Sequence, residues 1–474
     1  MKLRLLTLFT IVVYSFSATS QTTFAAGVNI DPNVGADPYA INSADLDGDT
    51  FIDIVIGTYN FSSDFIRWYK NDGLGNFTQQ TVISNDAGLQ GIGGLAIADL
   101  DGINGNDIIA GSYSGKVVWF ANDGMGGFGA EQLIGNLLGA GQVTTADINN
   151  DGHLDVVGVG FDANKVVWYA GDSAGNFGSE QIIEDTANFP GLVTQPGNVS
   201  FTDLDGDTDL DALIGYVDTT TDGTIEVFYN QYIESGTMTV SWLKDANTVT
   251  SGDPFLFVAA FADVNDDMVT DIIKCDNVSG EVAWYNKEMD GTYTETGISD
   301  DTIIDRPAVV KVSDLDNDGY NDVVLTDGGT ADDSIIWFES TNSGGFNTEA
   351  LIADNNHQVF AFTIADFDGD TDKDIATVGF GSDTLDWYEN ELFTLGIDDL
   401  ESETISMFPN PSKGMVYFKG IDTLMEINVY SILGERILSA SVNESSPLDI
   451  SNLASGVYMI QFEGSNASQR LVKQ

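Results

Sequence analysis

One short segment built on alternating aspartates recurs seven times in this chain of 474 residues. The first copy reads Asp-Leu-Asp-Gly-Asp-Thr-Phe-Ile-Asp, and every copy has Asp at its first and ninth positions. Successive copies begin 48 to 60 residues apart, and self-similarity at such a period indicates a repeat architecture. We number the copies loops one to seven: Asp45–Asp53, Asp99–Asp107, Asp147–Asp155, Asp203–Asp211, Asp263–Asp271, Asp314–Asp322 and Asp366–Asp374.

Each loop is followed by two further recurring elements. Trp beside Tyr or Phe comes 20 to 23 residues after the start of six loops, and the fourth repeat has Val227-Phe228-Tyr229-Asn230 instead. A Gly-x-Phe element follows in four repeats, as in Gly75–Phe77. With the apolar run before each loop and the β-branched run after it, each repeat predicts four short strands. We therefore expect an all-β chain that forms a seven-bladed β-propeller, since a parallel solenoid usually has shorter repeats.

The two ends of the repeat region complement each other. The seventh repeat stops at Trp387–Asn390, without Gly-x-Phe, and Phe24–Ile30 has the pattern of the missing fourth strand. If the two segments share one blade, the ring closes and no sheet edge is left exposed. We expect the propeller to span residues 21–394, with a linker at 395–405.

Composition narrows the classes of function. The chain has 74 Asp and Glu against 17 Lys and Arg, a formal net charge of −57, and 66 of the acidic residues lie in residues 21–400. A content of 42% hydrophobic and 11% aromatic residues is too high for a disordered acidic chain. The charge has the wrong sign for a nucleic-acid partner. One Cys and two His exclude a disulfide framework and make a His-based zinc site a poor fit.

The N-terminus has the pattern of a targeting segment. Met1–Arg4 is basic, Leu5–Phe16 is almost continuously apolar, and Ala18-Thr19-Ser20 offers small residues for cleavage. This order predicts a secretory signal peptide over residues 1–20. The apolar run is too short to span a bilayer, and we expect no transmembrane segment in the mature chain.

The repeat motifs resemble a known family. The Asp-x-Asp-x-Asp loop, the Val-x-Trp-Tyr strand and the Gly-x-Phe element are similar to the FG-GAP (VCBS-type) repeats of integrin-α-like propellers, over about residues 22–393. The resemblance implies the propeller fold. It leaves the function open because the family serves many roles.

The spacing within the loops suits calcium. Ca²⁺ takes six to eight oxygen ligands, and a tight loop can direct alternate residues at one centre. Positions one, three, five and nine would supply side-chain oxygens, and position seven a backbone carbonyl. About six or seven structural Ca²⁺ ions are therefore expected. The proposed ligands are Asp45, Asp47, Asp49, Phe51 and Asp53; Asp99, Asp101 and Asp107; Asp147, Asn149, Asp151, His153 and Asp155; Asp203, Asp205, Asp207, Asp209 and Asp211; Asp263, Asn265, Asp267, Val269 and Asp271; Asp314, Asp316, Asp318, Tyr320 and Asp322; and Asp366, Asp368, Asp370, Asp372 and Asp374.

Loop two departs from this pattern. Ile103 stands where the third side-chain ligand belongs, so its site is doubtful unless Asn104 substitutes. An EF-hand would need Glu at position twelve, where these loops have residues such as Ile56 or Leu325. A dockerin-like pair would be followed by helices, and plain Asp-rich turns would not repeat the alternation seven times.

Other conspicuous residues have structural interpretations. Six of the seven Trp share one repeat position, which favours packing between blades over carbohydrate stacking; only Trp242 lies off the pattern. Cys275 follows a strand and is expected to be packed. No nucleophile motif or phosphate loop is present in the sequence, although 74 acidic residues would hide a catalytic carboxylate pair.

Composition changes near residue 395, and residues 406–474 have the alternation of a small β-sandwich, which could be an Ig-like binding module. Their motifs closely resemble the type A C-terminal sorting domain of type IX secretion in Bacteroidetes. The resemblance implies the secretion machinery as a partner and a secreted or outer-surface location. The residues that carry it are Pro409, Asn410, Pro411, Gly434, Leu453, Gly456, Tyr458 and Lys473.

Two functions stay open at this point. The first is a non-enzymatic surface or secreted binding module for a glycan or protein ligand. The alternative is a secreted polysaccharide lyase or hydrolase with its site on a propeller face. We favour the first because no catalytic constellation is visible, and we expect unequal loops of the fourth repeat, Asp218–Gly223 and Thr248–Pro254, to shape the binding face.

Overall fold

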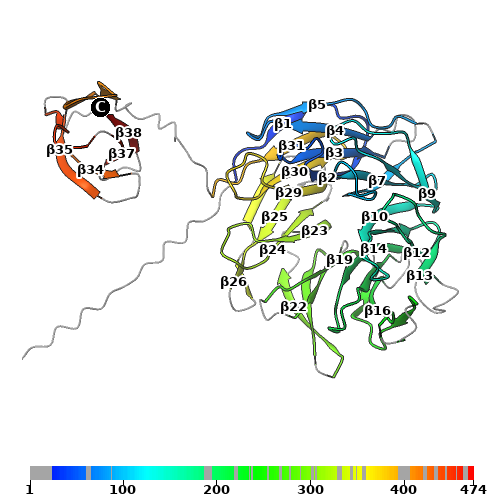
Figure 1. The fold of residues 1–474 in the computed structure, drawn as a ribbon. Coiled ribbons are helices and arrows are strands. Elements are labelled where there is room, and N and C mark those ends of the chain that lie inside the picture. Colours follow the sequence, from blue (N-terminus) through cyan, green and yellow to red (C-terminus); the bar gives the residue numbers. More distant parts are fainter. Residues whose placement is uncertain are drawn as a thin grey trace, which may run out of the picture. The chain divides into compact units, whose positions relative to one another are not determined.

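The computed structural model of the chain divides into two compact units, Met1–Thr394 and Leu395–Gln474 (Figure 1). All named elements of the described residues are β-strands. The predicted signal peptide and linker, and loop residue Asp267, lie outside the described residues. The structure describes residues 24–59, 66–86, 88–185, 195–217, 223–233, 235, 239–253, 256–265, 269–276, 279–288, 290–299, 304, 307–327, 334–341, 345–347, 350–354, 359–392, 406–419, 424–431, 436–443, 446–454, 456–462 and 468–474.

The first unit consists of antiparallel sheets, one for each repeat. Seven sheets of four or five strands are present in its described part, and each Asp loop joins the first strand of a sheet to the second. The first four sheets are β2 (Pro38–Ala44), β3 (Asp53–Thr58), β4 (Ile66–Asn71) and β5 (Phe77–Gln79); β6 (Ile92–Ala98), β7 (Asp107–Ser112), β8 (Lys116–Phe120) and β9 (Gln132–Asn136); β10 (Ala140–Ala146), β11 (Asp155–Gly160), β12 (Lys165–Tyr169) and β13 (Gln181–Asp185); and β14 (Pro196–Thr202), β15 (Asp211–Tyr216), β16 (Gly223–Asn230), β17 (Trp242–Lys244) and β18 (Thr250–Asp253).

The remaining sheets follow the same order of strands. They are β19 (Leu256–Ala262), β20 (Asp271–Asp276), β21 (Val282–Lys287) and β22 (Tyr293–Ser299); β23 (Pro307–Ser313), β24 (Asp322–Asp327), β25 (Ser334–Phe338) and β28 (Ala350–Asp354); and β29 (Val359–Ala365), β30 (Asp374–Gly379), β31 (Thr384–Tyr388) and β1 (Val28–Asp31). A short hairpin, β26 (Ser340–Thr341) with β27 (Gly345–Phe346), extends the sixth repeat.

The sheets stand in a closed ring. The first strand of each sheet contacts the first strand of the next, from β2 through β6, β10, β14, β19 and β23 to β29, and β29 contacts β2 again. These strands line the centre of the ring in Figure 1. The expected all-β propeller is thereby confirmed as the fold.

The last sheet is completed by the N-terminal segment. Strand β1 pairs antiparallel with β31, with Val28 opposite Trp387, and Phe24 bridges Asn390. Residues more than 350 positions apart in the sequence thus share one sheet, and neither end of the repeat region leaves the ring open.

Packing between blades explains two of the recurring motifs. Trp387 is 6% exposed and meets the Phe77 ring of the next sheet edge to face, with ring centroids 6.4 Å apart. Gly75 of Gly-x-Phe has a φ of 71°, and a Cβ there would lie 2.3 Å from the Trp387 ring. Trp68 and Trp119 pack in the same way against the next repeat. The prediction that these Trp residues belong to the core is therefore right.

Two details of the strands differ from the sequence pattern. The fourth strand of the first repeat, which begins at its Gly-x-Phe element, is only Phe77–Gln79, because Ile83 and Ser84 pair with Ile66 beyond a break in the register. The fourth sheet gains a fifth strand, β18, which pairs with β16. Of the two unequal loops, Asp218–Gly223 is described only at Gly223, and Thr248–Pro254 contains β18 (Thr250–Asp253), with Pro254 outside the described residues.

The second unit is a small β-sandwich. Its two sheets are β32 (Ser406–Phe408), β33 (Met415–Lys419) and β36 (Leu448–Asp449), and β35 (Arg436–Val442), β34 (Met425–Ser431), β37 (Gly456–Phe462) and β38 (Ser468–Lys473). Val416 and Phe418 of the first sheet pack on Ile427 and Phe462 of the second, and all four are buried. The alternation of buried and exposed residues along β33 and β37 follows from this one-sided packing.

Candidate metal loops of the propeller

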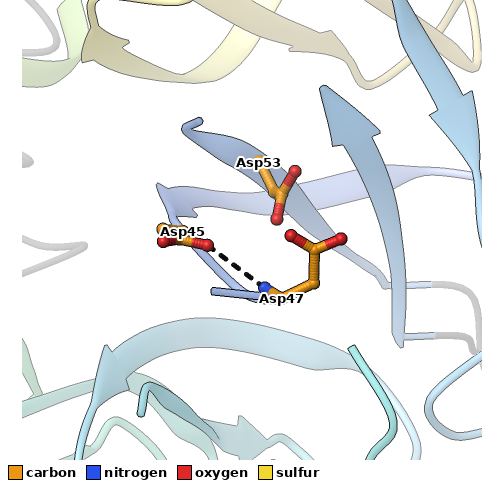
Figure 2. Close-up of side chains that lie close together, drawn as sticks. All are labelled: Asp45, Asp47 and Asp53. Atoms are coloured by element: carbon orange, nitrogen blue, oxygen red, sulfur yellow. Dashed lines mark hydrogen bonds between the residues drawn. The ribbon is translucent and has the colours of Figure 1, made fainter. Parts of the chain in front are cut away.

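The Asp loops bring carboxylates together because the hairpin topology places their first, third and ninth positions at one edge of the sheet. Figure 2 shows this for Asp45, Asp47 and Asp53 of loop one. In each such group one carboxylate oxygen per residue lies within 4.8 Å of the others. The groups found among the described residues are Asp45, Asp47 and Asp53; Asp99, Asp101 and Asp107; Asp203, Asp205 and Asp211; Asp314, Asp316 and Asp322; and Asp366, Asp368 and Asp374.

The first aspartate shapes the turn. Asp45 Oδ1 accepts hydrogen bonds from the N–H groups of Asp47 and Gly48 at 3.2 and 2.7 Å, and Oδ2 accepts one from Thr50 at 2.9 Å. Gly48 and Thr50 both adopt left-handed backbone, with φ of 77° each. Thr is a poor residue for that region because its side chain is β-branched. The loop therefore holds local strain, which is typical of ligand sites.

The ninth aspartate joins the loop to the third strand. Asp53 is fully buried, and its carboxylate accepts hydrogen bonds from Leu46 N–H at 2.9 Å and from Asn71 N–H on β4 at 2.8 Å. The same pair of bonds recurs in five other repeats, so this carboxylate is a fixed part of the fold whether or not a cation is bound. The five equivalent residues are Asp107, Asp155, Asp211, Asp322 and Asp374.

Asparagine side chains connect the loops of neighbouring blades. Asn71 Nδ2 donates to Phe367 O in the preceding blade at 2.6 Å, and Asn122 Nδ2 donates to Leu46 O at 2.9 Å. Asn230 and Asn390 make the equivalent bonds. The sequence does not reveal this role, because the partners of these asparagines lie 75 to 296 residues away.

The donor set fits a hard cation. Asp47 Oδ1, Asp207 Oδ2 and Asp370 Oδ2 are buried and accept no hydrogen bond from any described residue. Buried carboxylate oxygens are normally satisfied, so these oxygens are free to coordinate a metal ion. Oxygen-only donors at this spacing match Ca²⁺ or Mg²⁺ and not a soft transition metal.

The loops are not equivalent. Loop two, doubtful from its sequence, still brings its three carboxylates together, while Ile103 is 56% exposed. In loop three the amide of Asn149 and the carboxylate of Asp147 both accept from Asp151 N–H, each at 3.0 Å. One bond is nevertheless shared by loops one, three, four, six and seven: the fifth-position carboxylate accepts from the N–H of position seven, which is Phe51, His153, Asp209, Tyr320 or Asp372. This bond orients the seventh residue through its backbone, independently of its side chain.

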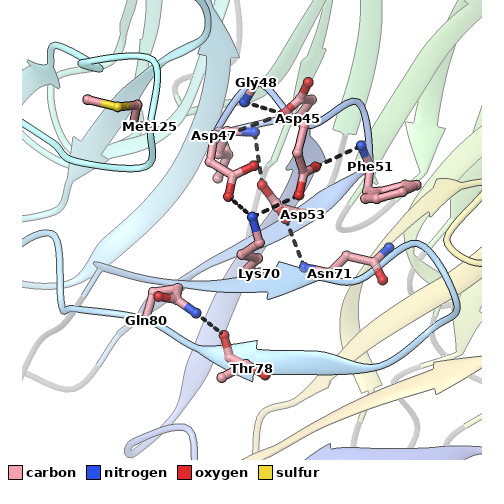
Figure 3. A network of polar contacts seen from close by, with 12 residues as sticks. Asp45, Asp47, Gly48, Phe51, Asp53, Lys70, Asn71, Thr78, Gln80 and Met125 are labelled. Carbon is pink, nitrogen blue, oxygen red and sulfur yellow. Dashed lines mark hydrogen bonds and ion pairs between the residues drawn. The ribbon is translucent and has the colours of Figure 1, made fainter.

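Loop one has a lysine that pairs with its carboxylates, whereas Lys373 within loop seven donates instead to Ser313 Oγ at 2.8 Å. Lys70 on β4 forms ion pairs with Asp47 and Asp49, the latter at 2.7 Å. Figure 3 shows Lys70 and Asp47 from close by. These two carboxylates raise the pKa of Lys70 and keep its ammonium charged. The sequence alone did not single out Lys70.

Burial makes the ninth aspartates hard to ionise when no cation is bound. Burial is the main cause that raises the pKa of Asp53 to about 7 and that of Asp374 to about 8, and neighbouring carboxylates of the same loop raise both further. The two backbone N–H bonds lower each pKa, but by less than burial raises it. In an unfolded chain the same groups would titrate near 4. Their ionisation therefore opposes folding until a cation compensates for it.

A specific pH dependence follows. Since the folded pKa of these groups lies above the unfolded one, the folded state binds protons more tightly. In chelator, the melting temperature is therefore expected to rise as the pH is lowered from about 8 to about 5. This gain in stability is lost when the pH rises through the pKa values that these aspartates have in the folded state. With millimolar Ca²⁺ this gain on acidification should vanish, because protons compete with the ion. Scanning calorimetry at several pH values checks this, and identical pH profiles with and without Ca²⁺ would contradict it.

One acidic cluster lies outside the loops. Glu184 on β13 is 1% exposed, and burial raises its pKa to about 8. Glu226 on β16 is 4% exposed and forms an ion pair with Lys244 at 2.7 Å. Burial is the main cause that raises the pKa of Tyr216, and the charges of the two nearby glutamates raise it further. Cys275 is 1% exposed, as expected, and burial raises the pKa of its thiol to about 12.

In the second unit, the predicted sorting residues hold the final strand in place. Asn410 donates through Nδ2 to Arg470 O at 2.6 Å and accepts from Val472 N–H at 2.8 Å. Tyr458 O–H donates to Ala454 O at 2.9 Å, and Gly456 pairs with Lys473. Leu453 N–H donates to Ile450 O, and Gly434 lies outside the described residues. The Pro409-Asn410-Pro411 segment therefore clamps β38.

Comparison with protein families identifies both units. Residues 45–102, 104–158, 147–214 and 314–377 match the FG-GAP-like repeat, and residues 406–474 match the secretion system C-terminal sorting domain. The chain is therefore an FG-GAP-repeat β-propeller protein. It carries, in addition, a C-terminal sorting domain of the type IX secretion system.

Solved structures of low sequence identity also match the chain. One is a lectin of Agrocybe aegerita, described for its specific recognition of non-reducing terminal N-acetylglucosamine; it is 17% identical, with a TM-score of 0.47, and the match covers 77% of this chain and 92% of the lectin. Another is BBS1N in complex with ARL6DN, 8% identical, with a TM-score of 0.48, covering 77% and 96% of the two chains. Comparison with curated protein sequences gives no match. Among the described residues, no helix has the length and apolar character needed to cross a membrane.

Proposed function

We propose that the chain is a calcium-binding propeller that reaches the cell exterior through the Sec and type IX pathways and acts there as a non-enzymatic binding module. The sorting domain supports the export route, and residues 1–20 supply the pattern of the Sec signal. The clustered carboxylates with buried, uncoordinated oxygens support Ca²⁺ as the ion that stabilises the loops. In this proposal the metal is structural, because the loops recur in every repeat.

The observation that favours a role in ligand binding is a cluster of aromatic side chains. The cluster lies where the first strands of the sheets begin, at the end of these strands opposite the Asp loops. Tyr39 at the start of β2 stacks on Phe360 of β29, with ring centroids 4.2 Å apart, and contacts Tyr59 just after β3 at 5.1 Å. Tyr59 in turn meets Tyr113, just after β7, edge to face at 5.0 Å. We call Tyr39, Tyr59, Tyr113, Phe360 and Phe380 the aromatic rim; all five are half-buried.

The aromatic rim has the chemistry of a glycan site. The antiparallel topology places it at the end of the sheets opposite the Asp loops, since it lies where first strands begin and second strands end. It joins three adjacent blades and combines aromatic faces with tyrosine hydroxyls. After burial, the charge of Asp162 raises the pKa of Tyr59, so an acceptor lies near the rim. Sugars use such apolar faces for stacking and such polar groups for hydrogen bonds.

A glycan array with the full chain in millimolar Ca²⁺ tests the proposal. We expect binding to a restricted set of glycans without turnover, and a loss of roughly tenfold or more in affinity for Tyr113→Ala, since one aromatic contact contributes on the order of 1–2 kcal/mol. Trp242→Ala, a change at a half-buried Trp away from the rim, is the matched control. If the Tyr113 variant binds glycans as well as the wild type does, the aromatic rim is not the binding site. If the chain binds a protein but no glycan, the ligand is a protein and the glycan proposal is wrong.

The alternative of a secreted polysaccharide hydrolase or lyase has one observation in its favour, the buried Glu184 and Glu226 beside Tyr216. Two carboxyl groups at one site can serve as acid and base. Turnover of a polysaccharide by the full chain, abolished in Glu184→Gln, would establish the enzyme. Binding without turnover would leave the two glutamates a structural role.

A further inference from the structure

Lys70, the residue that follows Tyr69 on β4, stands next to loop one, and each of the other third strands has a residue at the equivalent position. In the first blade Ile54 pairs with Tyr69, so Lys70 comes one residue beyond this pair, toward Asp53. The same register holds in the other six blades. It places the following residues at the position of Lys70: Ala121, Ala170, Tyr229, Asn286, Glu339 and Glu389.

This loop-facing position, as we call it, carries opposite charges in different blades. In blade one the Lys70 ammonium pairs with Asp47 and Asp49. In blade seven the carboxyl of Glu389 lies near Asp368 and Asp370, whose charges, after burial, raise its pKa. In blade six the pKa of Asp316 is raised mainly by burial and by the charge of Asp318. The charge of Glu339 raises it further. The position is therefore within electrostatic reach of the third ligand in all three blades, and of the fifth ligand in blades one and seven.

Loop one would otherwise resemble loops four and seven. All three have Gly at position four, Thr at position six and the same left-handed backbone at both. The side chain of Asp47 is 7% exposed, so its charge is largely removed from water, and the nearest compensating charge is Lys70. Because Lys70 holds Asp47 Oδ2 and Asp49 Oδ2, it uses oxygens that a metal ion would need at positions three and five.

We propose that Lys70 is a built-in cation that takes the place of the divalent ion in the first repeat, and that Glu339 and Glu389 act in the opposite sense by adding a carboxylate to loops six and seven. The propeller then has calcium sites of graded affinity, weakest in loop one and strongest in loops six and seven. This inference rests on the calcium-binding role proposed above. As a consequence, loop one keeps its closed conformation at low Ca²⁺ concentration, because Lys70 supplies the positive charge. Loops six and seven bind Ca²⁺ at lower concentrations than the other loops.

Equilibrium dialysis of the full chain with ⁴⁵Ca²⁺, from micromolar to about 10 mM, tests the assignment. In Lys70→Ala and Lys70→Glu, one weak site is expected to tighten by roughly tenfold or more, since a unit charge a few ångströms away acts strongly near the surface. In Glu389→Lys, one strong site should weaken by a similar factor. Lys116→Ala is the control, because Lys116 pairs with Glu131 at 2.7 Å away from the loops.

The outcomes separate this inference from the calcium proposal. If the wild type binds several Ca²⁺ ions and neither Lys70 nor Glu389 variants change any affinity, the graded sites are refuted and calcium binding stands. If the wild type binds none, the calcium proposal fails and this inference fails with it. Should Lys70→Ala fold poorly, its melting temperature decides: a deficit in chelator that Ca²⁺ repairs supports the inference, and a deficit equal with and without Ca²⁺ contradicts it.

Discussion

Removal of Ca²⁺ by a chelator is expected to lower the melting temperature of the propeller by about 10–20 °C. A site with a Kd of roughly 10⁻⁴ M, typical of extracellular modules, contributes about 2.7 kcal/mol when the ion is in about 100-fold excess. Six such sites sum to on the order of 16 kcal/mol, and the unfolding entropy of a domain this size, roughly 2 cal/mol/K per residue, converts that sum into the stated shift. Differential scanning calorimetry in chelator and in about 10 mM Ca²⁺ measures it.

Two controls make this measurement specific. Mg²⁺ should restore less stability than Ca²⁺, because it demands a tighter octahedral geometry than a loop of mixed carboxylate and carbonyl oxygens offers. Asp368→Asn in loop seven should reduce the calcium-dependent part of the shift, whereas Glu180→Gln, which removes a carboxylate paired with Lys165 outside the loops, should not. Equal melting temperatures with chelator and with Ca²⁺ would refute the role of the metal.

Deletion of residues 406–474 is expected to abolish export across the outer membrane almost completely. The sorting domain is a compact sandwich with its own core, and its last strand is held by Asn410. Its loss should leave the propeller inside the cell envelope, and a reporter placed between residues 1–20 and residues 395–474 should reach the exterior. Cell fractionation and surface labelling in a host that has type IX secretion measure both.

The fusion is the matched control for this deletion, since it shows whether the tail suffices when the propeller is absent. Export of the tail-less chain at the wild-type level would contradict the assignment of the second unit as the export signal. Retention of both the deletion and the fusion would also contradict it, because a sorting domain acts independently of its cargo.

The order of strands was predictable from local pattern. A fully buried second strand such as β3 is a run of apolar residues directly after its Asp loop, and the loop itself needs alternating aspartates with Gly48 at a left-handed position. The closing of the ring by β1 was predictable because the seventh repeat lacks what Phe24–Ile30 supplies. The repeat period and the pattern within each repeat were therefore sufficient to predict the fold.

What local pattern could not show depends on contacts distant in the sequence. The bond from Asn122 to Leu46 O spans 76 residues, and nothing near either residue indicates it. The aromatic rim gathers Tyr39, Phe360 and Tyr113 from three blades, so it exists only once the ring is closed. Lys70 acts on loop one because the antiparallel register turns it toward Asp47 and Asp49. A strand position that varies between repeats gives no motif to detect.

A count of the calcium ions bound by the purified full chain tests the central claim most directly. At about 1 mM free Ca²⁺, well within reach of extracellular sites, equilibrium dialysis should find about six ions per chain. Loop one would be the site that stays largely empty, and Lys70→Ala should raise the count toward seven. A chain that binds no ion, or one ion only, at this concentration would contradict the account of the loops as calcium sites.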